Sequence, residues 1–334
     1  MPANTEQLDL LIIGAGPAGI SAADAAAREG LNYLVVEKGL LADTIYHYPI
    51  GQTVFSTPEE LELRDGALQP CREKPTREEL LDHYVRFVLE HNLRINTGEA
   101  ALKIERAEPE GFIVHTDRNQ YRALRVLVAV GGMAHPRRLN VPGEDLPKAH
   151  HRFVESYPYV RRDALVVGGG NSAAEAALFL SEGGARTTFA IWRSDWTNRD
   201  PKMGAIKHWV RDPLARQIEL GRLRLLFFKE ILEISDQYVR VKRDDGEVIT
   251  LVNDVVFILI GADADLSLLR TLGVETAQAG LCEVPVYDPE TFETNIPGLY
   301  VAGHFTHARH IKEAIAVPRR IVPLIAQSLR ASVS

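Results

Sequence analysis

Two stretches of the chain share one pattern of apolar and polar positions: a short apolar run, a glycine-rich turn and an alanine-rich segment. The first covers residues 10–28 and the second covers residues 164–181. A short apolar run that ends in glycines favours a buried strand, and the segment that follows favours a helix. Each stretch leads to another apolar run, at residues 33–36 and 187–192. The pattern therefore predicts two βαβ units, and hence an α/β fold with parallel sheets.

The remaining pattern predicts one long loop, two further helices and several strands. The apolar positions of residues 43–57 follow neither the helical period nor the strand period, which predicts a long ordered loop. Residues 76–89 open with a capping box and predict a helix with one apolar face. Pro318 and Pro323 should kink or shorten a terminal helix that we expect over residues 311–329. Further strands are predicted at residues 112–114, 124–130 and 254–261.

Both glycine turns have the spacing of a dinucleotide site. In such a turn the first glycine makes the bend, the second lets the backbone approach a diphosphate, and a third small residue lets helix and strand pack closely. The N-terminus of the helix then favours the negative charge of the diphosphate. The first copy supplies Gly14, Gly16 and Gly19, and the second supplies Gly168 and Gly170.

The residues at the ends of the second strands distinguish the two copies. Glu37 follows the strand of the first copy, where a carboxylate can accept hydrogen bonds from an adenosine ribose. Arg193 stands at the corresponding place in the second copy, where a cation suits a 2′-phosphate. This difference favours NADP(H) over NAD(H) at the second site, with Arg199 as a further cation. Asp195 leaves NAD(H) open as an alternative.

Length and charge narrow the class of protein. The chain has 334 residues, enough for about two domains, and its 46% hydrophobic and 25% charged residues are typical of a globular protein. A net charge of −7 argues against nucleic acid as the main partner. No stretch approaches the ~20 apolar residues of a membrane helix, so we expect a cytoplasmic protein that does not bind membranes.

The chain has two cysteines, Cys71 and Cys282. Their separation in sequence excludes a CxxC motif and a disulfide framework. We expect each to be an ordinary reduced cysteine.

Five segments carry a resemblance to the thioredoxin-reductase-like flavoprotein family. They are GAGPAG (14–19), VAVGG (128–132), PRRLNVPGE (136–144), GGGNSAAE (168–175) and NIPGLYVAGH (295–304). Three others resemble its bacilliredoxin reductase, or bacillithiol disulfide reductase, branch, at residues 55–62, 73–77 and 157–159. The resemblance covers nearly the whole chain.

The resemblance implies two Rossmann-like domains, with the second inserted into the first. Residues 1–133 and 260–334 would form a discontinuous FAD-binding domain, and residues 134–259 would bind NAD(P)H. A homodimer is also implied. The FAD residues would be Gly14, Gly16, Gly19, Glu37, Lys38, Gln52, Thr53, Ala101 (through its backbone), Gly131, Gly303, His304, Lys312, Glu313 and Ala314. The NADPH residues would be Gly168, Gly170, Asn171, Ser172, Glu175, Arg193 and Arg199.

Three departures from the family pattern bear on the mechanism. Residues 141–167 hold no cysteine where thioredoxin reductases carry a CxxC, and Ala18 replaces a cysteine common in the closer branch. His304 stands where thioredoxin reductases have an aspartate. With His307 and His310 it forms a spacing that resembles metal ligation. We expect no metal there, because no acid or cysteine supports the cluster.

The expected function is that of a FAD-dependent NADPH oxidoreductase. Hydride would pass from NADPH to FAD, and electrons would then reach an external acceptor, either a disulfide-containing redox protein or a low-molecular-weight disulfide. No side chain is assigned a catalytic role, because the flavin carries the chemistry. Two alternatives remain open: a FAD- and NADPH-dependent monooxygenase, although no F-x-G-x-x-x-H-x-x-x-W-P-like element lies between the glycine motifs, and a non-catalytic flavin-binding redox sensor.

Overall fold

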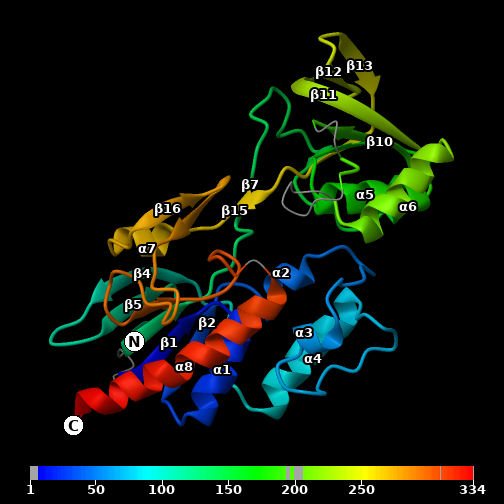
Figure 1. The fold of residues 1–334 in the computed structure, drawn as a ribbon. Coiled ribbons are helices and arrows are strands. Elements are labelled where there is room, and N and C mark those ends of the chain that lie inside the picture. The colour runs from blue at the N-terminus through cyan, green and yellow to red at the C-terminus, as the bar shows by residue number, and fades with distance from the viewer. Residues whose placement is uncertain (1–6, 193–195, 199–205, 309, 334) are drawn as a thin grey trace. The chain divides into compact units, whose positions relative to one another are not determined.

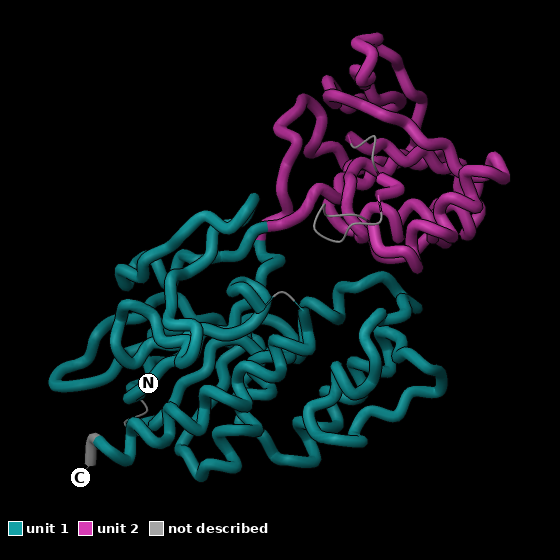
Figure 2. The backbone as a smooth tube through the Cα atoms, in the orientation of Figure 1, with its two compact units in different colours: residues 1–134, 263–334 teal, residues 135–262 magenta. Residues whose placement is uncertain are grey.

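The computed structural model describes residues 7–192, 196–198, 206–308 and 310–333. The chain divides into two compact units, which Figure 2 shows in two colours. Unit 1 comprises residues 1–134 and 263–334, and unit 2 comprises residues 135–262. The segments that join them contain β7 (His135–Pro136) and β15 (Ala262–Asp263), which pair as a two-stranded sheet.

Unit 1 is built on a seven-stranded sheet of order β3-β2-β1-β6-β5-β4, with β18 also paired to β6. Strands β3, β2, β1, β6 and β18 pair in parallel, while β4, β5 and β6 form an antiparallel meander. The elements are β1 (Gln7–Ile13), α1 (Pro17–Arg28), β2 (Tyr33–Glu37), α2 (Asp43–Tyr46), α3 (Pro58–Leu61), α4 (Arg77–Glu90), β3 (Ile95–Thr97), β4 (Ala101–Arg106), β5 (Phe112–Thr116), β6 (Gln120–Val128), α7 (Ser267–Thr271), β16 (Thr276–Ala279), β17 (Cys282–Pro285), β18 (Leu299–Val301) and α8 (Ile311–Val333).

The central strands of unit 1 are buried on both faces, which explains their continuous apolar runs. Leu10 and Ile12 of β1 face a core that includes residues of α1, α4 and α8. Leu11 and Ile13, which alternate with them, face a second core with residues of β5 and α7. One face of β1 thus packs on helices α1, α4 and α8, and the other face packs on residues of β5 and α7 (Figure 1).

Unit 2 holds another seven-stranded sheet, of order β13-β12-β11-β10-β9-β14-β8. Strands β11, β10, β9, β14 and β8 are parallel, and β11, β12 and β13 form an antiparallel meander. The elements are β8 (Ala149–His150), a 3₁₀ turn (Tyr157–Tyr159), β9 (Asp163–Val167), α5 (Asn171–Glu182), β10 (Arg186–Ile191), α6 (His208–Glu219), β11 (Leu223–Ile234), β12 (Tyr238–Arg243), β13 (Val248–Val252) and β14 (Val255–Ile258).

The predicted fold class is confirmed, since both units have the Rossmann-like β-turn-α-β arrangement at their glycine motifs. The capping box that opens α4 is present, with the Thr76 side chain accepting a hydrogen bond from the backbone N–H of Glu79. None of the helices in the described part of the chain combines the length and the apolar character needed to cross a lipid bilayer.

Two predictions of local structure were wrong in part. The segment expected to be a loop contains the short helix α2. The terminal helix α8 is not shortened by its prolines, because it runs from Ile311 to Val333 through both Pro318 and Pro323, while a kink at these prolines stays a prediction. Its residues Ile321, Val322 and Ile325 are fully buried in the core that α1 shares, and this burial offsets the hydrogen bonds that the prolines cannot make.

Candidate functional site

The first glycine motif lies where β1 ends and α1 begins. Gly14 has φ of +109°, and a Cβ placed on it would lie 2.5 Å from the carbonyl oxygen of Ala129. A Cβ on Gly19 would lie 1.8 Å from the carbonyl oxygen of Gly14. Around Gly16, in contrast, no atom of the described residues lies within 4 Å of the Cβ position. The backbone is therefore closed at Gly14 and Gly19, where a side chain would clash with neighbouring backbone atoms. It is open at Gly16, where a diphosphate must approach.

Glu37 lies beside this turn, at the end of β2. Its carboxylate accepts hydrogen bonds from the backbone N–H groups of Ala15 and Gly39, each at 2.7 Å. A carboxylate has about four acceptor positions, so capacity remains for ribose hydroxyls. The Glu37 carbonyl also accepts a hydrogen bond from Glu99, at 2.8 Å. That bond places the segment leading to Ala101 beside the end of β2. Lys38, which follows β2 directly, is exposed.

A second set of predicted residues gathers at the ends of β6 and β18, which pair with each other. Gly131 and Gly303 have φ of +77° and +98°. A Cβ on Gly303 would lie 3.2 Å from the Cβ of Ala18 in α1, and a Cβ on Gly132 would lie 2.4 Å from Nδ1 of His304. The structure thus brings these residues to the start of α1, as a flavin site on this edge of the sheet requires.

The other predicted FAD residues lie on two separate segments. Gln52 accepts a backbone hydrogen bond from Arg77 at 2.8 Å, and Thr53 forms an isolated bridge with Thr76, so both lie at the start of α4. Lys312 donates to the Glu60 carboxylate at 3.0 Å. Its neighbours on α8 differ: Glu313 is exposed and Ala314 is buried. Ser21 of α1 donates to the carbonyl of Ile315 at 2.8 Å, so the start of α8 contacts α1.

The second glycine motif repeats this geometry between β9 and α5. A Cβ on Gly168 would lie 2.4 Å from the Cβ of Ala173 and 2.5 Å from the carbonyl oxygen of Leu259. Gly170 caps α5, and no atom of the described residues lies within 4 Å of its Cβ position. Unit 2 therefore repeats the first closed glycine and the open glycine of unit 1, with Ala173 at the third position in place of a glycine. The residues of both motifs fit the diphosphate groups that the resemblance implies.

Three predicted NADPH residues follow on α5. The Asn171 side chain accepts a hydrogen bond from the backbone N–H of Lys207 at 2.8 Å. Ser172 is exposed, whereas Glu175 is buried, with 8% of its surface exposed. Burial raises the pKa of Glu175 to about 7, because a low-dielectric environment disfavours the ionised carboxylate. Arg193 and Arg199 lie outside the described residues.

Two residues near this edge, Trp192 and Lys207, were not predicted from the sequence. Trp192, directly after β10, is 50% exposed and lies against Gly169. Lys207 is brought to the start of α5 by its bond to Asn171. The signal for Trp192 was available, since it ends an apolar strand that runs into the candidate site. Nothing in the sequence marks Lys207, because its position depends on its hydrogen bond to Asn171, 36 residues earlier in the chain.

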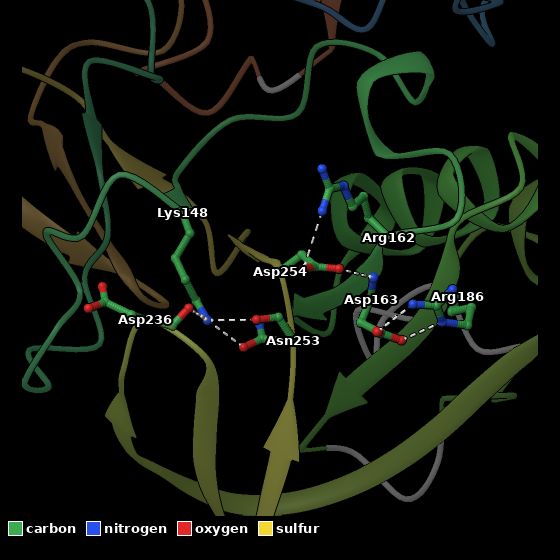
Figure 3. A network of polar contacts seen from close by, with 7 residues as sticks. All are labelled: Lys148, Arg162, Asp163, Arg186, Asp236, Asn253 and Asp254. Atoms are coloured by element: carbon green, nitrogen blue, oxygen red, sulfur yellow. Dashed lines mark hydrogen bonds and ion pairs between the residues drawn. The ribbon is translucent and has the colours of Figure 1, made fainter.

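A polar network lies at the opposite, amino-terminal edge of the unit 2 strands (Figure 3). Arg186 of β10 binds both carboxylate oxygens of Asp163 of β9, at 2.6 and 2.7 Å. Lys148 donates to the carbonyl and the side-chain oxygen of Asn253, at 2.9 and 2.6 Å. The network joins strand ends and lies away from the glycine turn, so we assign it to the fold.

The histidines of the H-x-x-H-x-x-H segment lie in the turn between β18 and α8. His307 Nδ1 is hydrogen-bonded to the hydroxyl of Tyr287, at 2.9 Å. Within the described ranges of the chain, no three His, Cys, Asp or Glu side chains come together as metal ligands would.

Comparison with known proteins identifies the family. The family model of the pyridine nucleotide-disulphide oxidoreductases matches residues 11–303. The chain belongs to the pyridine nucleotide-disulphide oxidoreductase family. The match spans both glycine motifs, and the chain is therefore a flavoprotein oxidoreductase that uses a pyridine nucleotide.

Two curated reductases and one solved reductase structure are similar to the chain over most of its length. Bacilliredoxin reductase Bdr of Bacillus subtilis is 35% identical over 294 residues, which are 88% of each chain. A ferredoxin–NADP reductase of Ignicoccus hospitalis is 28% identical over 96% of this chain and 94% of its own. The structure of bacillithiol disulfide reductase Bdr from Staphylococcus aureus superposes with a TM-score of 0.89 at 30% identity, over 99% of this chain and 100% of that chain. The resemblance inferred from the sequence is confirmed.

Proposed function

We propose that this protein is a FAD-dependent NADPH oxidoreductase that delivers electrons to an external disulfide, carried by a small redox protein or by a low-molecular-weight thiol compound. One observation carries the proposal: each unit has a strand-turn-helix motif with one open glycine, Gly16 or Gly170, at a helix N-terminus. The likeness to bacilliredoxin reductase supports the class of acceptor. The protein would act as a cytoplasmic homodimer.

Unit 1 would hold FAD. When bound, FAD supplies the transfer of a hydride equivalent from nicotinamide and of two electrons to an acceptor. The N-terminus of α1 and the open backbone at Gly16 would hold the diphosphate, and Glu37 would accept hydrogen bonds from the ribose. Gly131, Gly303 and His304 would line the flavin end, where His304 can donate or accept a hydrogen bond according to its tautomer.

Unit 2 would hold NADPH. The open backbone at Gly170 and the exposed Ser172 would bind its diphosphate at the N-terminus of α5. Arg193 and Arg199 would bind the 2′-phosphate. Lys207, placed beside this N-terminus by Asn171, would add a positive charge.

Electrons would leave without an internal dithiol. The chain has two cysteines. Cys71 is exposed in the segment before α4, and Cys282 begins β17. The first glycine motif carries Ala18 and no thiol. The acceptor would therefore have to approach the reduced flavin itself.

A one-electron carrier such as a ferredoxin is the second candidate acceptor. It is supported by the likeness to a ferredoxin–NADP reductase over nearly the whole chain and by the same lack of a CxxC, since a ferredoxin needs no thiol partner. Incubating the reduced protein with a disulfide protein, bacillithiol disulfide, a ferredoxin, a quinone and oxygen, each separately, would identify the acceptor by which one reoxidises the flavin fastest.

Anaerobic stopped-flow mixing tests the electron donor. We expect NADPH to bleach the flavin absorbance of the purified protein faster than NADH does. If neither nucleotide reduces the flavin, the proposal is wrong. Slow reduction of the flavin by NADPH under these anaerobic conditions would favour the redox-sensor alternative, and oxygenation of a substrate during reoxidation would favour a monooxygenase.

Replacing Arg193 with alanine should change the choice of nucleotide. We expect KM for NADPH to rise about tenfold to hundredfold, because a charge-assisted hydrogen bond to phosphate is lost, while KM for NADH stays unchanged. The matched control is Arg186→Ala, which removes an arginine at the start of β10 and should leave both values unchanged. An equal rise for the two nucleotides would refute the role of Arg193.

A further inference from the structure

Trp192 is a large aromatic residue left open at the edge of unit 2 where β10 ends. Its side chain is 50% exposed, whereas Ala190 and Ile191 directly before it are fully buried. A half-exposed indole contributes less to the core than a buried one and leaves part of its ring open to a ligand.

The ring is held in one orientation by two neighbours. Phe228 of β11 meets it edge to face, with centroids 6.3 Å apart and planes at 86°. Gly169 lies directly against it, because a Cβ on this glycine would be 3.0 Å from Cζ2, and the three nearest atoms all belong to the indole. Trp192 therefore rests on the backbone of the middle glycine of the motif, and it is positioned before any ligand arrives.

This position coincides with the adenosine half of a dinucleotide. In a βαβ site the diphosphate lies at the N-terminus of the helix, and the ribose lies at the end of the second strand. Gly170 caps α5 and β10 is the second strand, so the adenosine must lie beside the residue that follows Ile191. A flat, half-exposed ring at this point offers a stacking surface for a purine base.

We infer that Trp192 is the stacking platform for the adenine of NADPH. The inference rests on the proposed function for the identity of the donor and extends it by naming the residue that binds the base. Trp192 is a positioning residue, since adenine lies at the end of the nucleotide away from the reacting nicotinamide. It should govern the affinity for the nucleotide and leave the chemical step unchanged.

The test measures binding of 2′,5′-ADP, which has the adenosine and the 2′-phosphate but no nicotinamide, to the FAD-loaded protein by calorimetry. We expect Trp192→Ala to raise Kd about tenfold and Trp192→Phe to raise it less than about threefold, because phenylalanine retains a stacking face. The matched control is Tyr157→Ala, which removes an 81% exposed aromatic side chain from the 3₁₀ turn before β9 and should leave Kd unchanged. Thermal melting would show that each variant is folded.

Fluorescence supplies a second readout. We expect 2′,5′-ADP to quench part of the tryptophan emission of the unaltered protein and none of it in Trp192→Phe. A Kd for Trp192→Ala within about twofold of the original value would overturn the inference while leaving NADPH as the donor. Conversely, a protein that binds 2′,5′-ADP through Trp192 but is not reduced by NADPH would refute the proposed function alone.

Discussion

Gly16→Ala should abolish or strongly weaken FAD binding while leaving the apoprotein at least as stable as before. Gly16 has φ of −75° and ψ of −176°, a conformation that alanine adopts freely, and its Cβ position is open. Replacing glycine at such a position stabilises the fold by about 0.4–1 kcal/mol, because the unfolded chain loses freedom. The added methyl group would occupy the space that the diphosphate needs. The substitution should therefore raise the stability of the apoprotein and lower its affinity for FAD.

Gly19→Ala, three residues further along the same helix, should have the other outcome. Its Cβ would lie 1.8 Å from the carbonyl oxygen of Gly14 and 2.8 Å from the carbonyl carbon. Both are backbone atoms, which cannot move without displacing β1 or α1. We expect the free energy of unfolding to fall by about 3 kcal/mol or more, with FAD lost as a consequence of misfolding.

Urea unfolding of the two apoproteins and titration with FAD would separate these effects. The Gly16 variant should unfold at the same or a higher urea concentration than the original protein, and it should require at least about tenfold more FAD for half-saturation. Normal FAD affinity in this variant would contradict a diphosphate site at the start of α1.

Glu175→Gln should remove a dependence of stability on pH. Burial raises the pKa of the folded Glu175 carboxyl to about 7, from an ordinary value of 4.5. Between these values the unfolded chain releases the proton and the folded chain retains it, so the folded state loses stability as pH rises through this window. The shift corresponds to about 3 kcal/mol between pH 4.5 and pH 7.

A glutamine stays neutral at every pH, so it should not make the free energy of unfolding depend on pH. We expect the stability of Glu175→Gln, relative to the original apoprotein, to increase by about 3 kcal/mol from pH 4.5 to pH 8. Urea unfolding at several pH values measures the difference. The control is Glu182→Gln, which makes the same substitution at the exposed end of the same helix. A constant difference for Glu175→Gln would mean that burial does not perturb this carboxyl.

The sequence predicted the parts of the fold that follow from local periodicity. Apolar runs placed the central strands, and the closed positions Gly14 and Gly168 were predicted from the turn they must make. Features that depend on contacts between distant residues were not predictable. The continuity of α8 through Pro318 depends on its packing against α1. Likewise, the raised pKa of Glu175 depends on burial that one helix cannot reveal.

For the candidate site, residue identity was easier to predict than arrangement. Glu37 was expected to face a ribose, yet its bonds to Ala15 and Gly39 show that it also closes the turn itself. Lys312 was expected beside FAD, and the structure pairs it with Glu60 from a segment about 250 residues away. Such partners are set by the tertiary fold, which sequence spacing does not record.

The pairing of β7 with β15 brings the two ends of unit 2 together, which bears on whether this unit can be removed. The chain leaves unit 1 after residue 134 and returns at residue 263 through two strands that lie next to each other. An insertion whose two ends are adjacent can be excised and replaced by a short linker at little cost in loop-closure entropy. We therefore expect that unit 2 can be exchanged as a whole while unit 1 still folds.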